Sequence, residues 1–286
     1  MAKPHLFILT ALVLTSTLAK SEGQAPGEPE TAVVYNGPVT LHALLWRPQG
    51  RGPFPAILLN HGSGRSREEL ERLEPYERNA EELGPVFARH GYVFLYLFRR
   101  GVGLSADQGV NAIDLMNGEL AAHGLEARNA LQLQLLENRD MTDALSGLKF
   151  LRALPDVDAR DVAVIGHSFG GSLTLLMAER VSNLRAVVVV SGAGYSFDRS
   201  PELRARLLAA TARIAASVFF IHAENDYSLS SGKVLDARRE RLGKPHRLKI
   251  YPPIGHTVED GHDFLHLGVS IWEPDVFAFL DEHMRR

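Results

Sequence analysis

Apolar runs that predict strands recur along the chain, separated by longer amphipathic or polar stretches. Such runs lie at residues 56–59, 92–98, 162–165, 186–190, 218–222 and 247–251. The first and third of them are apolar throughout, as in strands that are buried on both faces. Residues 39–46 instead alternate apolar and polar positions and end at a Gly/Pro turn, which predicts an antiparallel strand.

Helical patterns fill the spaces between these strands. They cover residues 68–89, 111–154 and 274–284. Strands that alternate with helices in this way predict an α/β fold with a doubly wound, mostly parallel sheet of the eight-stranded type, flanked by helices. Residues 111–138 would form a helical insertion beside the sheet. No internal repeat or linker divides residues 26–286, so we expect a single domain.

The first 20 residues have the layout of a secretory signal peptide. Lys3 and His5 precede an apolar run at residues 6–14, which is too short for a comfortable membrane span, and small residues suited to cleavage follow at 17–19. A buried N-terminal helix is the alternative, although the run has no amphipathic pattern. We expect residues 1–25 to be a signal peptide and spacer, the mature protein to be secreted or periplasmic, and no membrane span to remain after processing.

Composition narrows the function classes. The 286 residues are 45% hydrophobic and 23% charged, as in a soluble globular protein, and a formal charge of −3 without a basic stripe argues against a nucleic-acid partner. The chain has no cysteine, which excludes a thiolate nucleophile and a Cys-ligated metal. No feature of the sequence specifies an oligomeric state.

The most specific chemical motif is the Gly-x-Ser-x-Gly at residues 166–170, with Ser168 at its centre. Residues 162–165 predict a buried strand before it, and the sequence after it has helical character. A serine on a sharp turn from strand to helix is a nucleophile elbow, because the strained backbone exposes the hydroxyl and the glycines leave room for the turn. The helix that begins at Phe169 also directs free N–H groups toward charge that develops beside that hydroxyl.

A serine hydroxyl becomes a good nucleophile only when a base takes its proton and a third group orients that base. In folds with this elbow the partners follow in the chain order Ser, Asp or Glu, His, each after a later strand. Asp226 lies in the loop directly after the strand predicted at residues 218–222, so it is the expected acid. Glu224 in the same loop is its rival.

Two histidines compete for the role of base. His256 is closer to the end of the strand predicted at residues 247–251, whereas His262 lies in a Gly-His-Asp-Phe pattern. Spacing therefore favours His256 and the local pattern favours His262. With His266 nearby, three histidines invite comparison with a metal site, but no HExxH or carboxylate set accompanies them, and we expect no metal.

A Gly-x-Gly-x-x-Ala stretch at residues 101–106 follows a predicted strand and resembles a dinucleotide-binding loop. Such a loop needs a helix directly after it and a second strand ending in an acidic residue about 20 positions later. Here a long helical stretch follows, and no strand is predicted before Val162. The segment fits better as a loop in which Arg99 or Arg100 pairs locally, and we expect no cofactor.

Five motifs in this order resemble the dienelactone hydrolase branch of the α/β-hydrolase superfamily. They are HGSG at His61, RRGVGLS at Arg99, GHSFGG around Ser168, AENDYS at Glu224 and GHDF at Gly261. The resemblance covers residues 39–280 and implies an α/β-hydrolase fold with the catalytic histidine in the Gly-His-x-Phe motif, at His262, with His256 as the alternative. The namesake enzymes of the branch are cytoplasmic and use a cysteine nucleophile, so the resemblance does not point to dienelactone itself as the substrate.

Two backbone N–H groups are expected to form an oxyanion hole. One belongs to Phe169, directly after the nucleophile, and the other to the HGSG loop, where Ser63 is the expected residue. The plain alternative for that loop is a turn that ends a strand. We expect the helical insertion and the loop at residues 192–201, through Tyr195 and Phe197, to line the site.

These residues predict an exported serine hydrolase that cleaves small-molecule carboxylic esters or lactones through an acyl-enzyme. Ser168 would attack, His262 would transfer the proton, and Asp226 would orient the imidazole. Two alternatives stay open. A serine peptidase of the prolyl-oligopeptidase type would be supported by a long propeller domain, and a non-enzymatic binding module on the same fold would be supported by a missing triad residue.

Overall fold

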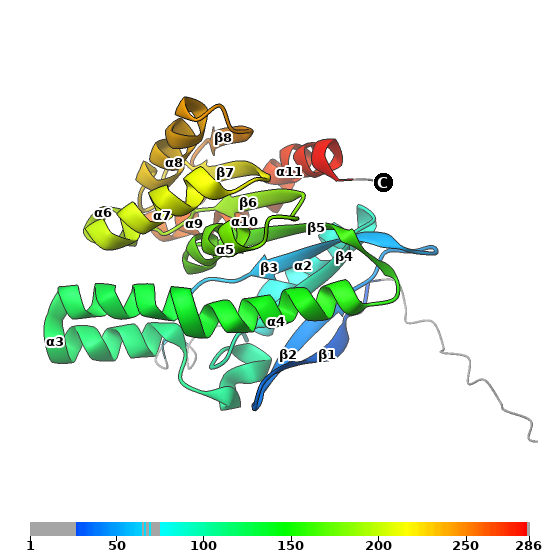
Figure 1. Ribbon diagram of the computed structural model, residues 1–286, viewed down its shortest axis with the longest axis horizontal. Helices are drawn as coiled ribbons and strands as arrows, with labels where there is room; N and C mark the ends of the chain where they lie inside the picture. Colours follow the sequence, from blue (N-terminus) through cyan, green and yellow to red (C-terminus); the bar gives the residue numbers. More distant parts are fainter. Residues whose placement is uncertain (1–26, 65, 67–68, 70–74, 285–286) are drawn as a thin grey trace, which may run out of the picture.

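Eight strands form a single sheet in the computed structural model, with helices on both faces (Figure 1). The structure describes residues 27–64, 66, 69 and 75–284, so the signal peptide predicted within residues 1–25 lies outside the described residues. The strand order is β1-β2-β4-β3-β5-β6-β7-β8. The strands are β1 (Glu30–Asn36), β2 (Val39–Trp46), β3 (Phe54–Asn60), β4 (Val93–Phe98), β5 (Val157–His167), β6 (Ala186–Val190), β7 (Ser217–Ala223) and β8 (His246–Tyr251).

The sheet is antiparallel at one edge and parallel over the rest. β1 pairs with β2 and β2 with β4 in antiparallel register, whereas each pairing from β4 to β8 is parallel. The predicted doubly wound, mostly parallel sheet is therefore confirmed. The strand without a counterpart in the sequence prediction is β1, which begins a few residues after the predicted signal peptide and spacer (1–25) and has only two buried residues.

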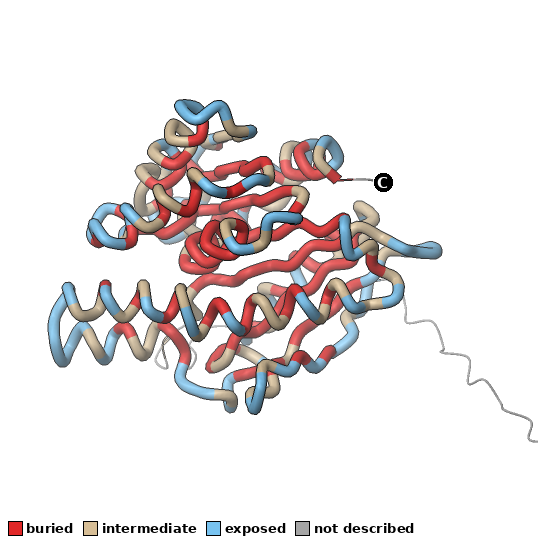
Figure 2. Tube along the Cα trace, viewed as in Figure 1, coloured by how far each residue is buried: buried red, intermediate tan, exposed pale blue. Residues whose placement is uncertain are grey.

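Both faces of the sheet are buried, which explains its continuous apolar strands. In β3, Ala56 and Leu58 belong to one hydrophobic cluster, and Ile57 and Leu59 belong to a second cluster on the opposite face. Successive side chains of a strand point to opposite faces, so a run of four apolar residues serves both clusters. Figure 2 shows the buried strands enclosed by helices that are exposed on their outer sides.

Helices connect the strands. They are α2 (Glu77–Arg89), the 3-10 helix η1 (Gly103–Gln108), α3 (Ala112–Gln134), the π-helical turn η2 (Leu135–Arg139), α4 (Asp140–Ala153), α5 (Phe169–Arg180), α6 (Ser196–Arg199), α7 (Pro201–Arg213), α8 (Ser230–Arg241), α9 (Val258–His262), α10 (Phe264–Leu267) and α11 (Val269–His283). Of the helix predicted at residues 68–89, α2 accounts for the part from Glu77 onward. Residues 70–74 are outside the described residues.

The predicted helical insertion is a hairpin that stands beside the sheet (Figure 1). Gly124 has a φ of 83° and a ψ of −176°, which divides α3 into two helical segments where the chain reverses. Such a positive φ strains residues other than glycine. The second segment continues through η2 into α4. Asn111 caps the first segment, because its side-chain oxygen accepts the N–H of Asp114 at 2.8 Å.

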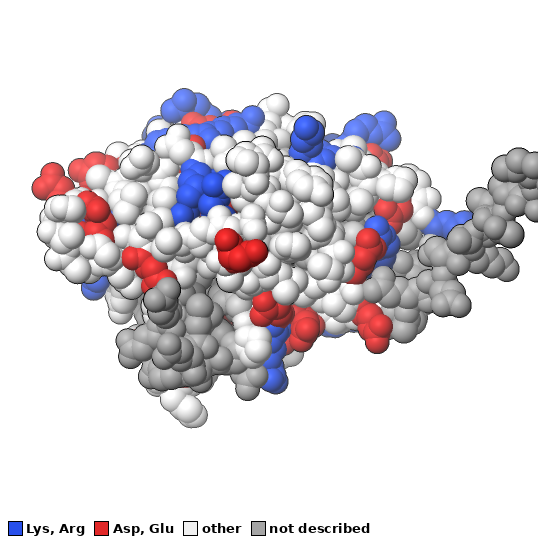
Figure 3. Space-filling view, turned by 90° about the horizontal axis from the view of Figure 1, so that it is seen from below, with Lys and Arg blue, Asp and Glu red and all other residues white. Residues whose placement is uncertain are grey.

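The surface carries charges of both signs. On the face in Figure 3, basic and acidic side chains lie interspersed, without a continuous basic stripe. Within the described residues, none of the helices combines the length and the apolarity that a membrane crossing requires.

Candidate active site

Ser168 occupies the sharp turn between β5 and α5, at the carboxyl end of the parallel strands. Its φ of 53° and ψ of −118° lie outside the regions that residues other than glycine prefer. A Cβ on Gly166 would lie 2.2 Å from the carbonyl oxygen of Gly170, and a Cβ on Gly170 would lie 2.0 Å from the carbonyl oxygen of Asn60. The two glycines of the motif are therefore required by close backbone packing around the strained serine.

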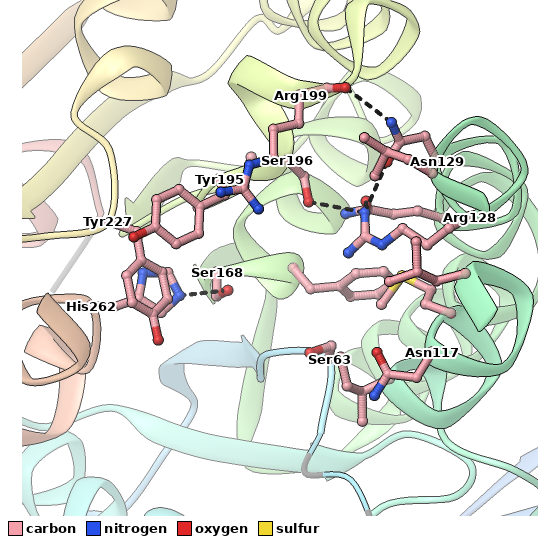
Figure 4. Close-up of a pocket in the computed structure, with 18 residues that line it drawn as sticks. Ser63, Asn117, Arg128, Asn129, Ser168, Tyr195, Ser196, Arg199, Tyr227 and His262 are labelled. Atoms are coloured by element: carbon pink, nitrogen blue, oxygen red, sulfur yellow. Dashed lines mark hydrogen bonds between the residues drawn. The ribbon is translucent and has the colours of Figure 1, made fainter.

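The structure brings the three predicted triad residues into one hydrogen-bonded chain. The Ser168 hydroxyl lies 2.8 Å from Nε2 of His262 (Figure 4), and Nδ1 of His262 lies 2.7 Å from Oδ1 of Asp226. The side chain of His262 is 13% exposed and that of Asp226 is 0% exposed. With a proton on Nδ1 donated to Asp226, Nε2 is free to accept the serine proton.

The two rival residues lie away from this chain. His256 is exposed, and its backbone N–H donates to Oδ2 of Asp260 at 2.7 Å. Glu224 is also exposed, whereas Asp226 in the same loop is buried. The geometry therefore favours His262 over His256 and Asp226 over Glu224.

A second imidazole contacts the acid. Nδ1 of His222 donates to Oδ2 of Asp226 at 2.7 Å, and the backbone N–H of Tyr227 donates to Oδ1 at 2.6 Å. Burial alone would raise the pKa of the Asp226 carboxyl, but the hydrogen bonds from His222 and His262 hold that pKa well below its ordinary value. His222 was not among the predicted site residues, although a histidine at the end of a strand of apolar residues was the feature that could have drawn attention to it.

The HGSG loop reaches the nucleophile from β3. A Cβ on Gly62 would lie 3.8 Å from Cβ of Ser168, and Ser63 lines the cavity beside it. The N–H of Phe169 belongs to the first turn of α5, where backbone N–H groups have no partner within the helix. Of the two predicted oxyanion donors, Phe169 directly follows Ser168 at the start of α5, and Ser63 lines the cavity that Ser168 also lines.

Arg99 holds this loop in place. Its guanidinium donates to the carbonyl oxygens of His61 at 2.8 Å and Gly62 at 2.5 Å, and its Nε donates to Asp140 at 3.2 Å. The guanidinium carbon also lies 5.7 Å from the ring centre of Phe169. Arg99 is 1% exposed, so this cation is buried and paired. It links the HGSG loop, α4 and the start of α5.

The imidazole of His61 is fixed beneath the same loop. Its Nε2 accepts the backbone N–H of Arg99 at 3.1 Å, and its Nδ1 lies 2.8 Å from the carbonyl oxygen of Gly62. Burial, together with the charge of Arg99, holds the pKa of His61 well below its ordinary value. A neutral ring that accepts at Nε2 and donates at Nδ1 satisfies both contacts.

The Gly-x-Gly-x-x-Ala stretch does not lead directly into an α-helix, as a dinucleotide-binding loop would. Most of it lies in η1, where Ser105 accepts the backbone N–H of His42 in β2 at 2.8 Å. The preceding Arg100 pairs with Asp143 of α4 at 2.5 Å. The segment is a connection that packs beside β2, as the alternative interpretation expected.

The loop after β6 is strained and wraps the triad. Ser191, Ala193 and Gly194 have φ values of 52°, 65° and 48°. The N–H of Ala193 donates to the carbonyl oxygen of Ser168 at 3.0 Å, and a Cβ on Gly194 would lie 3.2 Å from Cε1 of His262. Strain of this kind persists where the surrounding structure fixes the chain, and here it keeps the loop against the imidazole.

Of the two aromatic residues predicted to line the site, one does. Tyr195 lines the cavity and stacks on Tyr227 at 4.7 Å, and Tyr227 stacks on His262 at 4.1 Å. The prediction for Phe197 is wrong, because its side chain is fully buried in the hydrophobic core beneath α6. Burial, followed by the charge of Glu259, raises the pKa of Tyr227 to about 12, so it stays a neutral ring over the imidazole.

Two cavities meet at the nucleophile. One of about 360 Å³ lies toward α3 and α6, and one of about 530 Å³ lies toward α2 and α9. Ser63, Ser168, Tyr227 and His262 line both. The hydroxyl of Ser168 is therefore open to a substrate that extends to either side of the reacting bond.

A set of side chains that shares only His266 with the three histidines weighed above could hold a metal ion. Among the described residues, ligand atoms of His167, Asp263 and His266 lie within 4.8 Å of one another. His167 also donates from Nε2 to the carbonyl oxygen of His262 at 2.8 Å. Burial and the neighbouring His262 lower the pKa of His167 to about 4, which keeps its ring neutral at physiological pH. His167 thus holds the backbone of His262 in place.

The sequence of the chain decides its family. The family model for the dienelactone hydrolase family matches residues 74–262, which is more than half of the chain and includes Ser168, Asp226 and His262. The chain belongs to the dienelactone hydrolase family. It is therefore a hydrolase with an α/β-hydrolase fold, as the motifs predicted. A search of curated proteins found no match.

Solved structures resemble this member of the dienelactone hydrolase family in fold. A dienelactone hydrolase from Anabaena variabilis is 20% identical, with a TM-score of 0.60 over 90% of this chain and 100% of that one. Est1E from Butyrivibrio proteoclasticus, with ferulic acid bound, is 17% identical, with a TM-score of 0.63 over 88% and 98% of the two chains.

Peptidases share the fold as well. An acylaminoacyl peptidase from Pyrococcus horikoshii is 18% identical, with a TM-score of 0.63 over 91% of this chain. The alignment covers only 42% of the peptidase chain, so this hydrolase spans about two fifths of the length of that relative.

Proposed function

We propose that the protein hydrolyses carboxylic esters or lactones, with Ser168 as nucleophile, His262 as general base and Asp226 as the group that orients the base. The observation that carries this proposal is the hydrogen-bonded chain from the Ser168 hydroxyl through His262 to Asp226. A nucleophile, a base and an orienting acid in contact are the requirements of serine hydrolysis.

In the first half-reaction, Oγ of Ser168 forms a bond to the carbonyl carbon of the ester while Nε2 of His262 takes its proton. The carbonyl oxygen becomes an oxyanion, to which the N–H groups of Phe169 and Ser63 donate. When the tetrahedral intermediate collapses, the bond to the alcohol oxygen breaks and His262 returns the proton to that oxygen. The acyl group stays on Ser168.

In the second half-reaction, water replaces the alcohol. His262 takes a proton from water as the hydroxyl adds to the acyl carbon, and then protonates Oγ of Ser168 as the acid leaves. Asp226 is ionised throughout, since its pKa is held far below neutrality, and it stabilises the imidazolium at each step. The products are one alcohol, or the ring-opened hydroxyl of a lactone, and one carboxylic acid.

We propose esters rather than peptides as substrates because the chain belongs to the dienelactone hydrolase family. Proteins of similar fold include a dienelactone hydrolase and Est1E with ferulic acid bound, and these chains align over nearly their full lengths. The peptidases align over about two fifths of theirs. The two cavities at Ser168 provide one side for the acyl group and one for the alcohol.

We also propose that the protein works outside the cytoplasm. The support is the layout of the first 20 residues, with Lys3, an apolar run and small residues after it. Fractionation of cells that express the full chain, with the intact mass of the recovered protein, tests this. We expect an extracytoplasmic protein shortened by about 20–25 residues, and a full-length cytoplasmic protein would contradict it.

The test of the catalytic proposal compares Ser168→Ala with a matched control, Ser182→Ala, at an exposed serine in a turn. We expect Ser168→Ala to lower kcat on 4-nitrophenyl butyrate by about 10⁴- to 10⁶-fold with an unchanged circular dichroism spectrum, and the control to keep full activity. The corresponding 4-nitroanilide should be cleaved far more slowly by the wild type. Retained activity in Ser168→Ala, or faster cleavage of the anilide, would contradict the proposal.

A further inference from the structure

A second group of polar side chains lies beside the triad, in the cavity toward α2 and α9. Ligand atoms of His167, Asp263 and His266 lie within 4.8 Å of one another, and all three residues line this cavity together with Ser168. The hydrogen-bonded chain from Ser168 to Asp226 uses none of these three side chains. They are therefore available to hold a ligand of their own.

Two of the three side chains are brought together by local sequence. The backbone N–H of His266 donates to the carbonyl oxygen of Asp263 at 3.0 Å, which closes one helical turn at the start of α10. Side chains three positions apart on such a turn are neighbours. Nε2 of His266 accordingly lies 4.0 Å from Oδ1 of Asp263. The sequence Asp-Phe-Leu-His at residues 263–266 thus presents a carboxylate and an imidazole side by side.

The third side chain, His167, comes from the end of β5 and is oriented as metal-binding histidines usually are. Its ring centre lies 6.0 Å from that of His266, with the two rings nearly perpendicular. Its Nε2 donates to the carbonyl oxygen of His262 at 2.8 Å, so the lone pair of the neutral ring is on Nδ1. Metal-binding histidines usually donate their other ring N–H to a carbonyl or a carboxylate, which fixes the tautomer and the direction of the ring.

The charge of the cavity also favours a cation. Besides Asp263, the acidic side chains of Glu69, Glu259 and Asp260 line it, and among the described lining residues none is a lysine or an arginine. Carboxylates gathered on a concave wall raise the local concentration of cations. The side chain of Asp263 is 48% exposed and that of His266 is 8% exposed. An ion can therefore enter from solvent and be partly shielded once it is bound.

We propose that His167, Asp263 and His266 bind a divalent transition-metal ion such as Zn²⁺. Two imidazoles and one carboxylate are a ligand set that suits Zn²⁺, whereas Mg²⁺ and Ca²⁺ prefer oxygen ligands alone. A bound Zn²⁺ lies about 2.0–2.2 Å from each ligand atom, so the three side chains draw closer together around it. Three ligands from the protein leave at least one position for water.

An ion in this place interferes with the reaction. His167 directly precedes Ser168, and Asp263 directly follows His262, so the ion is held by the chain neighbours of the nucleophile and the base. It fills part of a cavity that the substrate needs, and its positive charge beside His262 disfavours the imidazolium that forms during catalysis. The site therefore inhibits the enzyme when it is loaded. Only this inhibition rests on the proposed function.

The binding test is calorimetric titration of the untagged protein with ZnCl₂ in a buffer without chelators. We expect one ion per chain, with a Kd of about 10 µM or lower. His266→Gln and Asp263→Asn should each weaken binding by at least about tenfold, because even the loss of an outer partner of a metal ligand costs about 10- to 100-fold. The matched control, Glu259→Gln, removes an exposed carboxylate of the same cavity and should change the Kd by less than about threefold.

Two further variants distinguish this site from other histidines that could take up zinc. His262→Ala removes the catalytic imidazole but keeps the carbonyl oxygen to which His167 donates, and His256→Gln removes an exposed imidazole. Both should bind Zn²⁺ within about threefold of the wild type. Loss of binding in either variant as large as in His266→Gln would overturn the proposal. Weak uptake of several ions that no single variant reduces would also overturn it, as an adventitious ion only.

The inhibition test compares each protein with itself, with and without Zn²⁺ at about ten times the wild-type Kd. We expect kcat/KM of the wild type on 4-nitrophenyl butyrate to fall about tenfold and to recover with a chelator, whereas His266→Gln should lose less than about twofold. Equal inhibition of the two proteins would show that zinc acts elsewhere and overturn the inhibitory role.

Ser168→Ala separates failure of the metal site from failure of the proposed function, since its titration with Zn²⁺ needs no turnover. Binding to Ser168→Ala without any ester cleavage by the wild type would leave the metal site standing and refute the catalytic proposal. Ester cleavage by a wild type that binds no Zn²⁺ would refute the metal site alone.

Discussion

Asp226 accepts hydrogen bonds from two imidazoles, but only one of them touches the nucleophile. His262 bridges Asp226 and Ser168, whereas His222 donates to the other carboxylate oxygen from the end of β7. Because the second oxygen is held by a fully buried ring, the carboxylate has one orientation toward His262. We infer that His222 positions the acid and takes no proton from the substrate.

Substitution of the two candidate bases, His262 and His256, should have opposite effects on kcat. His262→Ala removes the ring that contacts Ser168, so kcat should fall by about 10⁴-fold or more, since triad members act as a unit. His256→Ala removes an exposed side chain and should leave kcat within about threefold of the wild type, as surface changes usually do. Steady-state kinetics on one 4-nitrophenyl ester measure both, and the reverse ranking would reassign the base to His256.

The residues of the site differ in how far the sequence predicted them. Ser168 and Asp226 follow from motifs close behind the ends of β5 and β7, whereas His262, eleven residues after β8, follows from its Gly-His-Asp-Phe pattern rather than from its distance to a strand. The pairing of His222 with Asp226 depends on how the end of β7 turns, which no motif describes. Phe197 was expected in the cavity because its loop lies between core strands, but the short helix α6 turns it into the core.

Among the elements, the elbow depends on glycine at two positions. A methyl group at Gly170 would lie 2.0 Å from the carbonyl oxygen of Asn60, so Gly170→Ala must separate β3 from α5. We expect a loss of about 2–4 kcal/mol in the free energy of unfolding and a lower kcat, because the HGSG loop follows β3 directly.

The matched control is Gly118→Ala in α3, where an added Cβ would meet no atom within 4 Å. This substitution should leave the stability unchanged or raise it by up to about 1 kcal/mol, since alanine favours helix. Chemical denaturation of both variants measures the difference. Equal stabilities would mean that the elbow tolerates a larger residue and that the packing argument is wrong.

Most elements are where the apolar pattern predicts them, and the exceptions have local reasons. β1 alternates buried and exposed residues at a sheet edge, so its pattern is weak. α11 begins at Val269 rather than at Pro274. The turn before Pro274 is also helical, and it buries the side chain of Trp272. α8 carries many charged residues and buries few side chains, which gives it little apolar periodicity. α7 was not predicted although its buried residues, Leu203, Leu207, Ala210 and Thr211, lie at helical spacing.

For the whole molecule, the ionised Asp226 links stability to pH. Its pKa in the folded protein is lowered by His222 and His262, so its contribution is complete above the unfolded pKa of about 3.9 and is lost as the pH falls toward the folded value. Asp226→Asn should therefore have a melting temperature about 2–8 °C below the wild type at pH 7.

That difference in melting temperature should shrink as the pH is lowered below about 4. The control is Asp107→Asn, which changes an exposed aspartate on η1 and should show no comparable gap at any pH. Differential scanning calorimetry between pH 3 and 7 measures both variants. A gap that stays constant or widens in acid would show that the Asp226 carboxylate is not stabilised by its imidazole partners.

The arrangement of the sheet explains why the sequence could predict which loops form the candidate site. The loops after β3, β4, β5, β6 and β7 all leave the same edge, since the strands between β4 and β8 are parallel. In such sheets ligands bind outside the carboxyl ends of two adjacent strands whose connections leave in opposite directions. Here these strands are β3, which leads to β4, and β5, which leads to β6. The helical hairpin then adds one wall of the cavity, whose side chains no motif specifies.

The most direct test of the central claim is covalent labelling of the full chain with a fluorophosphonate, followed by peptide mapping. An activated serine within reach of His262 should react at its Oγ, so we expect one labelled peptide with the modification on Ser168. The label should disappear in Ser168→Ala and be greatly slowed in His262→Ala, and it should persist in His256→Ala. Modification of any other residue, or no reaction in the folded wild type, would contradict the account.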